Sequence, residues 1–459
     1  MIRTQHTVPG FYRRMLVLAI PIALQNMLAS CAGLVDTAMV ARLGDIATSA
    51  VGIGGKWSTL IQMITFGFCS GGSVLISQYW GAGERREVRR AYSLGLSLCL
   101  LVALVYIVLA ACFPYQMMCV FTNEEAVRAA GAEYLGTVCW GAVPLAFATI
   151  SGMARRSVED VRVPLVTSGI AVCVNTFFNW CLIYGELGMP QLGLRGAAVA
   201  TVISHWVHAA LVIGIGIRQK HFTVYGLQEL KTISRAFAQK YFRIALPVIC
   251  NETLWCVGFN LYSIIYARQG SANYAAYTLY SSIEQLVFVF FVGACNACAI
   301  MIGKSIGQGL REEAGAIARR MLGVFLVMGA VLGGSLLLLR WPIINMMGVE
   351  NRYTAQMTAD ILAFYCCWCP MRQLNYVLIV GILRAGGDTR TAMLLDVGVT
   401  LLWGVPVTFL LAYGLKLPFL WIVCGTFVAE DLLKLPLCLW RMKSGKWIQC
   451  LAGEETASL

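Results

Sequence analysis

The chain has 459 residues, of which 59% are hydrophobic and only 13% are charged. Soluble domains carry about 25% charged residues, so this composition excludes an ordinary soluble globule. The formal net charge of +12 does not indicate nucleic-acid binding, because the basic residues recur between apolar runs instead of forming one basic patch. The sequence therefore predicts an integral membrane protein.

Apolar runs long enough to cross a bilayer follow one another along the chain. A hydrocarbon core of about 30 Å needs roughly 20 helical residues, and the strands of a membrane β-barrel would show short alternating patterns instead. We therefore expect an all-α, polytopic membrane protein with twelve transmembrane helices. The expected spans lie near residues 15–40, 50–78, 91–113, 131–153, 163–184, 194–217, 241–267, 275–303, 317–339, 358–382, 391–413 and 417–440.

The loops on one side of the membrane carry most of the Lys and Arg residues, for example Arg85 and Arg86 after the second span. Cytoplasmic loops are enriched in this way, so both termini are expected in the cytoplasm, as an even number of spans requires. The apolar run after Arg13 and Arg14 is too long for a signal peptide and lacks a small-residue cleavage site. It is therefore expected to be retained as the first helix.

The two halves of the chain repeat one another. The stretch "AIPIALQN" around Pro21 corresponds to "ALPVICNE" around Pro247. At the same spacing, "ISQYWGAGERRE" (76–87) matches "IGKSIGQGLREE" (302–313) in its Ile, Gly, Arg and Glu residues. Because proline removes a helical hydrogen bond, the two prolines are expected to allow their helices to bend.

This duplication predicts an N-terminal lobe (1–217), a charged cytoplasmic linker (218–240) and a C-terminal lobe (241–459) that ends in a short cytoplasmic tail. Each lobe would hold six spans, so both would insert in the same direction. Such parallel repeats are related by a pseudo-two-fold axis along the membrane normal, with substrate bound between the halves and access alternated by rocking. The architecture favours a transporter over an enzyme.

The first half carries polar residues inside its expected spans. Asp36 and Gln25 lie on one face of the first span, together with small residues. Asn175 and Asn179 share a face of the fifth span, and Thr201 lies in the sixth. Because ionisable residues at membrane depth are usually functional, Asp36 is the leading candidate, whereas the asparagines serve equally well to join helices.

The second half places several acidic residues in or near apolar runs. Glu252 is the best candidate, since it has apolar neighbours on both sides in "CNETLWCVG". Glu284 and Asp396 are further candidates, with Asp396 close enough to a cytoplasmic loop to be partly hydrated. Three charged residues near the end of the last span are expected to pair structurally: Glu430, Asp431 and Lys434.

Other motifs have simpler explanations. The spacing in "CNAC" (295–298) and "CCWC" (366–369) resembles that of metal sites, but no such pair lies in a loop with histidine partners, and buried Cys behaves as a small apolar residue. His205 and His208 are assigned to helix packing. The loop "WGAGERREVRRA" (80–91) lacks the phosphate-loop pattern. No ATP motif occurs elsewhere, so an ion gradient is the expected energy source.

Four stretches, taken in order, resemble the multidrug and toxic compound extrusion (MATE) family of cation-coupled antiporters. They are "AIPIALQNMLASCAGLVDTAMVARLG" in the first span, "LISQYWGAGERREVRRA" after the second, "NTFFNWCLIYGELGMPQLGLRGAAVAT" across the fifth and sixth, and "GILRAGGDTR" after the tenth. The resemblance covers about residues 11–450. It implies twelve helices in two lobes around a central cleft, no cofactor, and export of amphipathic, often cationic compounds in exchange for H⁺ or Na⁺.

The resemblance also implies which residues act. Asp36, after a bend-forming proline, fits the family's first-helix carboxylate, and Asn175 and Thr201 fit its network on the fifth and sixth helices. Many relatives carry Asp where this chain has Asn179, which leaves proton coupling through two carboxylates open. Glu252 resembles the seventh-helix cation site of some branches. The coupling ion would be H⁺ or Na⁺, with Na⁺ held at Asp36 or Glu252.

In this interpretation a cationic compound competes with the coupling ion for one negative charge, and the competition produces exchange. The alternative is a lipid-linked oligosaccharide flippase of the same wider superfamily, which needs a cleft rich in Arg and Lys. Only Lys56, Arg372 and Lys434 fall within the expected spans. The paired acids of a membrane-embedded transferase are absent. We expect a monomer in the bacterial inner membrane, with small organic molecules and lipid as partners and no nucleic acid.

Overall fold

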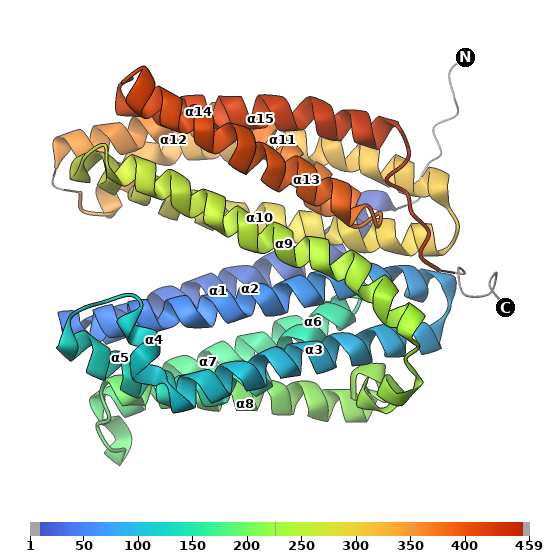
Figure 1. Cartoon of the computed structure of the whole chain (residues 1–459), viewed down its shortest axis with the longest axis horizontal. Helices are drawn as coiled ribbons and strands as arrows, with labels where there is room; N and C mark the ends of the chain where they lie inside the picture. The colour runs from blue at the N-terminus through green and yellow to red at the C-terminus, as the bar shows by residue number, and fades with distance from the viewer. Residues whose placement is uncertain (1–9, 225, 350, 453–459) are drawn as a thin grey trace. The chain divides into compact units, whose positions relative to one another are not determined.

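The structure of the protein, a computed structural model, describes residues 10–224, 226–349 and 351–452. Within these ranges the chain forms helices joined by turns and short loops (Figure 1). The first half contains α1 (Phe11–Ala41), α2 (Asp45–Ala82), α3 (Arg85–Cys112), α4 (Pro114–Cys119), α5 (Glu125–Val138), η1 (Cys139–Gly141), α6 (Ala142–Ser157), α7 (Arg162–Tyr184), η2 (Glu186–Gly188) and α8 (Leu194–Gln219).

The second half repeats this series of long helices after two short connecting segments. The segments are η3 (Phe222–Val224) and η4 (Gly226–Thr232). The helices that follow are α9 (Arg235–Ala267), α10 (Ser271–Gly307), α11 (Arg311–Met346), α12 (Arg352–Tyr376), η5 (Val377–Arg384), α13 (Thr389–Val399), η6 (Thr400–Gly404), α14 (Val405–Phe409), η7 (Leu410–Gly414) and α15 (Phe419–Lys443).

The expected all-α architecture with twelve spans is confirmed for the described residues. Eleven helices are long and apolar enough to cross a membrane, when continuous runs such as α5 to α6 and α13 to η7 are each taken as one. The twelfth is α15, which carries Glu430, Asp431 and Lys434 in its middle. The predicted cytoplasmic positions of the two ends of the chain fall on residues 1–9 and 453–459, which lie outside the described residues.

Large apolar side chains cover the outside of the helices. Leu338 on α11 and Leu402 on η6 are 82% and 81% exposed, and many others are similarly placed. Apolar surface on this scale is stable only in a solvent of lipid chains, because water would drive it to associate. The chain is therefore a multi-pass membrane protein.

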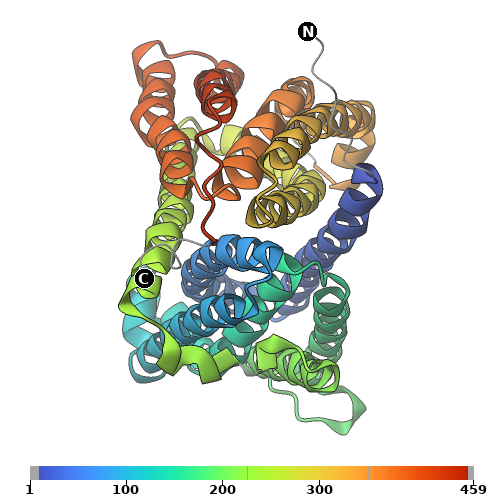
Figure 2. The same ribbon diagram turned by 90° about the vertical axis from the view of Figure 1, so that its right-hand side faces the viewer.

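The contacts divide the chain into two compact units. The N-unit comprises Leu24–Ile76 and Glu84–Ile249, and the C-unit comprises the described residues up to Ala23, the segment Ser77–Gly83 and the chain from Cys250 onwards. Each unit is a helical bundle, which Figure 2 shows with the helices more nearly end-on. The lobes predicted from the chain order alone, 1–217 and 241–459 with a linker at 218–240, remain a prediction.

Two helices pass from one unit to the other shortly after a proline. α1 contains Pro21 and changes unit after Ala23, and α9 contains Pro247 and changes unit after Ile249. Both prolines lie inside continuous helices, as the sequence predicted. The two helices thus change unit at corresponding positions of the internal repeat, two residues after the matched prolines.

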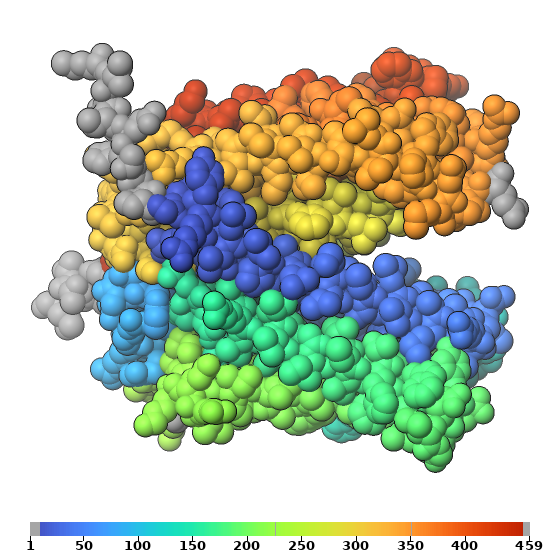
Figure 3. Space-filling view, turned by 180° about the vertical axis from the view of Figure 1, so that it is seen from behind, coloured from blue at the N-terminus to red at the C-terminus, as the bar shows by residue number. Residues whose placement is uncertain are grey.

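Within the N-unit, α7 and α8 pack side by side along their lengths (Figure 3). The close approach depends on Gly196, because a Cβ atom at this position would collide with the carbonyl oxygen of Leu182 on α7. The turn between the helices begins at Gly185, whose φ of 78° is in the left-handed region that favours glycine. This pair of helices carries three of the predicted site residues.

The segment predicted as a charged linker is attached to the N-unit. Gly226 lies so close to the ring of Tyr92 on α3 that a Cβ atom would overlap it. The ring of Phe222 contacts the same tyrosine edge-to-face at 5.7 Å. Further along, the Nε of Arg89 donates to Glu229 at 3.0 Å. The segment is thus held by packing and by charge.

His221 lies at the start of this segment. Its Nδ1 is 3.0 Å from the hydroxyl of Thr223, and its ring lies 4.4 Å from that of Phe222. Burial, and secondly the positive charge of Arg155, lower the pKa of His221 to about 4. The docked segment therefore holds the imidazole in its neutral form.

We predict that replacing Gly196 with Ala lowers the free energy of unfolding by about 1–3 kcal/mol, because α7 and α8 must move apart. The matched control is Gly214→Ala on the same helix, where an added Cβ meets nothing within 4 Å. This control should leave stability unchanged or raise it by up to about 1 kcal/mol. Thermal or denaturant unfolding in detergent measures both, and equal effects of the two variants would contradict the packing argument.

We predict that acid loosens the docked segment through His221. Its pKa is about 4 when docked and about 6.5 when released, so the released form binds more protons between these values. The docking is thus strongest above about pH 6.5 and weakens as the pH falls towards about 4. Hydrogen exchange of residues 226–232, corrected for the intrinsic rate, measures this. The pH dependence should disappear in His221→Gln, and its survival there would exclude His221 as the cause.

Candidate functional site

Asp36 lies at the centre of a hydrogen-bonded group in the N-unit. The Nδ2 of Asn179 donates to the Oδ1 of Asp36 at 2.6 Å. With the amide of Asn175 turned so that its nitrogen faces the carboxylate, this nitrogen lies 2.8 and 3.2 Å from the two carboxylate oxygens. Thr201 adjoins the group, with its hydroxyl 3.5 Å from the Asn175 amide. Four predicted residues from three helices are therefore brought together.

The local sequence explains this geometry. Asn175 and Asn179 are four residues apart on α7, which puts their side chains on one face of the helix, and both are buried. Tyr184, further along α7, donates its hydroxyl to the backbone carbonyl of Met39 on α1 at 3.0 Å. This bond fixes α1 against α7 close to Asp36.

Asp36 has amide donors but no basic partner. Within the part of the chain that the structure describes, no Lys, Arg or His forms an ion pair with it. Hydrogen bonds from two amides stabilise the ionised carboxylate without neutralising its charge. The site can therefore accept a proton or another cation without displacing a resident one.

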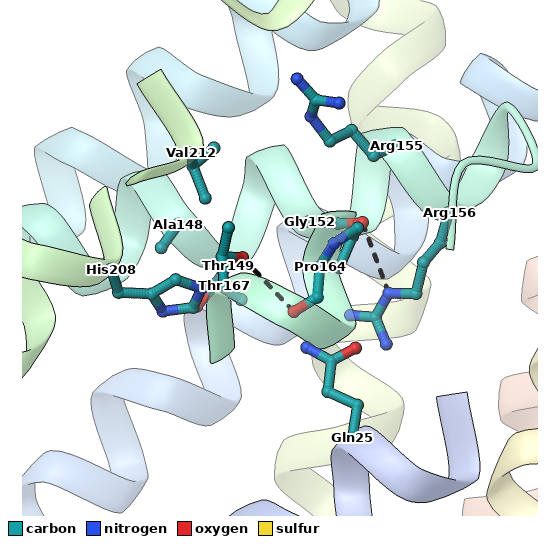
Figure 4. A pocket seen from close by; sticks show the side chains of 10 residues that line it. All are labelled: Gln25, Ala148, Thr149, Gly152, Arg155, Arg156, Pro164, Thr167, His208 and Val212. Atoms are coloured by element: carbon teal, nitrogen blue, oxygen red, sulfur yellow. Dashed lines mark hydrogen bonds between the residues drawn. The ribbon is translucent and has the colours of Figure 1, made fainter. Parts of the chain in front are cut away.

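Gln25 is not part of this group. It lines a separate cavity of about 100 Å³ in the N-unit, bounded by α1, α6, α7 and α8 (Figure 4). His208, assigned to packing from the sequence, lines the same cavity. His205 lies against Gly141 of η1, where an added Cβ would be 2.8 Å from its Nδ1, and its assignment to helix packing stays a prediction.

In the C-unit, Glu252 forms an ion pair. The Nη1 of Arg384 lies 2.8 Å from its Oε1, and Arg384 is only 3% exposed. Arg384 lies at the end of η5, a π-helical segment, which is a common irregularity at functional sites. A cation arriving at Glu252 would have to compete with this guanidinium.

Asp396 belongs to a second buried group centred on Lys434. The Nζ of Lys434 donates to Asp396 at 2.7 Å, to Glu430 at 2.6 Å and to Thr400 at 2.9 Å. Asn251 donates to the other carboxylate oxygen of Asp396 at 3.2 Å. The expected pairing of Glu430 with Lys434 is confirmed, but Asp396 is buried rather than partly hydrated, because it is the second partner of the same lysine.

Glu284 belongs to a third group. It accepts a hydrogen bond from Tyr280 at 2.7 Å and lies 3.4 Å from the Nε of Arg372. Asp431 lies 3.9 Å from the same guanidinium and accepts a bond from Trp368 at 2.9 Å. The sequence had indicated that Asp431 pairs with Lys434. In the structure its basic partner is Arg372 instead.

Each predicted carboxylate of the C-unit therefore has a basic partner, whereas Asp36 has none among the described residues. Sequence reasoning missed most of the partners because they are distant in the chain. From the sequence, Arg384 was placed in a loop after the tenth span. Asn251 was not selected, because the adjacent Glu252 was the stronger candidate. In the described residues no group of three or more His, Cys, Asp or Glu side chains is placed to hold a metal ion.

Comparisons with known proteins agree with this fold. The family model MatE matches residues 21–181 and 247–410. The probable multidrug resistance protein NorM of Thermotoga maritima is 24% identical over 446 residues, which cover 96% of this chain and 94% of that protein. A crystal structure of MATE in the bent conformation superposes with a TM-score of 0.85 at 16% identity, covering 95% and 96% of the two chains. A mutant of the Vibrio cholerae MATE transporter VcmN gives a TM-score of 0.86 at 17% identity, covering 96% and 99%.

The duplicated helical fold is that of a polytopic membrane protein, and the family match makes it a membrane transporter, not an enzyme. The family model covers more than half of the residues, in two stretches that begin at Pro21 and Pro247. The chain belongs to the MATE family of multidrug and toxic compound extrusion transporters.

We predict that Lys434→Met destabilises the protein by about 3–5 kcal/mol, because it leaves two buried carboxylates without their cation. Unfolding in detergent measures the loss. The triple variant that adds Asp396→Asn and Glu430→Gln removes the uncompensated charges and should recover most of the stability. A single variant as stable as the wild type would mean that the lysine does not compensate Asp396 and Glu430.

Proposed function

We propose that this protein exports amphipathic, cationic organic compounds in exchange for H⁺ or Na⁺, and that Asp36 carries the coupling. The proposal is supported by the relatives of similar length, which are named multidrug resistance proteins. It is supported above all by the geometry around Asp36, an intramembrane carboxylate with amide donors and no basic partner among the described residues.

Exchange follows from competition for one negative charge. When the site is open to one side, a proton or Na⁺ neutralises Asp36. For Na⁺, the amides of Asn175 and Asn179 would turn their oxygens toward the ion, and the Thr201 hydroxyl would be a further ligand. A cationic compound binds favourably only when that ion has left. Binding of one cation thus lowers the affinity for the other by the same factor, and rocking of the two lobes would alternate access to the site.

The carboxylates of the C-unit have a different role in this proposal. Glu252, Glu284 and Asp396 each lie within hydrogen-bond or ion-pair distance of Arg384, Arg372 or Lys434. Their charges are already compensated, so we assign them to the stability of the C-unit, with Na⁺ binding at Glu252 as the competing assignment. The same compensation disfavours a flippase, since these basic side chains are not available to a pyrophosphate group.

We further propose that the transporter acts as a monomer in the bacterial inner membrane with both termini in the cytoplasm. The support for this orientation is the enrichment of Lys and Arg in one set of loops. On this orientation the segment η3–η4 faces the cytoplasm.

The test is ion exchange in proteoliposomes. Ethidium is added outside while the internal pH and Na⁺ are followed for the wild type, Asp36→Asn and Glu252→Gln. We expect the dye to drive ion release in the wild type, a loss of at least about tenfold in Asp36→Asn, and retained exchange in Glu252→Gln, provided that variant folds. Asp36→Asn is close in shape and keeps a side chain able to hydrogen-bond, so its loss of exchange reflects charge.

Loss of exchange in Glu252→Gln alone would move the coupling site to the C-unit. Absence of exchange in all three proteins, for every cation and both ions, would contradict the antiporter assignment. Transbilayer movement of a labelled lipid-linked sugar would then be measured with the same proteoliposomes.

A further inference from the structure

The cavity in the N-unit is chemically unlike the Asp36 group. Its polar lining includes Arg156 from α6, Gln25 from α1, His208 from α8 and Thr167 from α7. In Figure 4 the side chains of Arg156 and Gln25 point toward one another at one side of the cavity. No carboxylate is among the lining residues.

The charge of Arg156 is not compensated by an acidic side chain. Its Nε donates to the backbone carbonyl of Gly152 at 3.4 Å, and no carboxylate of the described residues forms an ion pair with it. Its neighbour Arg155, which also lines the cavity, provides the contrast. That side chain turns away from Arg156 (Figure 4), is fully buried, and donates through Nη1 to Asp160 at 2.6 Å and to Gln219 at 2.9 Å.

The other polar groups of the cavity do not supply the missing charge. The hydroxyls of Thr149 and Thr167 donate to backbone carbonyls within their own helices at 2.8 and 2.9 Å. The side chain of Gln25 offers an amide N–H, and His208 is a neutral or positive ring. A guanidinium held in a partly enclosed, low-dielectric site without a carboxylate is stabilised by a bound counter-ion.

We propose that this cavity binds a small monovalent anion, such as chloride or a two-carbon carboxylate, with Arg156 as the principal ligand and the Gln25 amide as a second donor. A cavity of about 100 Å³ has room for such an ion, since about 10–15 Å³ of this kind of space already holds a water molecule, whereas a sugar acid such as gluconate is much bulkier. The bound anion joins α1 to α6. This site is independent of cation exchange at Asp36.

The test is anion-dependent stability of the purified full chain in detergent. Thermal unfolding is followed while sodium gluconate is replaced by sodium chloride or by sodium acetate at constant ionic strength. A ligand that binds only the folded state raises the unfolding temperature in a saturable manner. We expect this rise in the wild type and none in Arg156→Gln. The matched control is Arg162→Gln, an exposed arginine at the start of α7, which should respond as the wild type does.

Arg156→Lys keeps the charge but loses the planar fork of donors, so we expect it to weaken the apparent affinity about tenfold. This variant provides the test if Arg156→Gln gives no cooperative unfolding transition in gluconate. A response to only one of the two anions supports the proposal and identifies the ligand. A wild type that shows no saturable rise, or Arg156 variants with the wild-type response, would overturn it in favour of a cavity filled with water.

Discussion

A charged side chain inside a bilayer must be compensated, and the two units of this transporter meet that constraint in opposite ways. In the C-unit, Lys434 lies between Asp396 and Glu430, and Arg384 holds Glu252. In the N-unit, Asp36 receives only neutral amide donors. The charges of the C-unit are paired, and removing one partner of such a buried ion pair lowers the stability of the protein. Asp36 keeps a charge that a mobile cation can neutralise, and the proposed transport chemistry depends on that difference.

The order of the spans could be predicted from the sequence because each is a long apolar run with its own length requirement. The Asp36 group could also be predicted in large part. Asn175 and Asn179 are related by helical periodicity, and that local rule survives folding. For Gln25, a shared helix face did not predict the correct neighbours. It shares a face of α1 with Asp36, but the helix is long enough for one face to meet different neighbours at its two ends, and Gln25 lines a different cavity.

The partners in the C-unit could not be predicted, because they depend on contacts between helices that are far apart in the chain. Arg384 is a loop residue by its sequence context, yet it lies 3% exposed at the end of a π-helical segment. Lys434 pairs with Glu430 one turn away, as helical spacing predicts, and also with Asp396 from another helix. A π-helical turn shifts the direction of every later side chain on the helix, so the three segments η5, η6 and η7 disrupt the periodicity on which such predictions depend.

Because η3 and η4 are attached to the N-unit, the connection between the two halves of the chain is not a free, flexible loop. The connection between the halves and the first turns of α9 belong to the N-unit, so the chain passes into the C-unit inside α9, shortly after Pro247. α1 divides in the same way shortly after Pro21, and α2 divides between Ile76 and Ser77. A helix resists twisting and stretching far more than a loop does. The helices α1 and α9 can each yield as curvature near the proline, where one backbone hydrogen bond is missing. Part of the flexibility of the chain thus lies at two prolines inside helices rather than in the connecting segment η3–η4, which is attached to the N-unit.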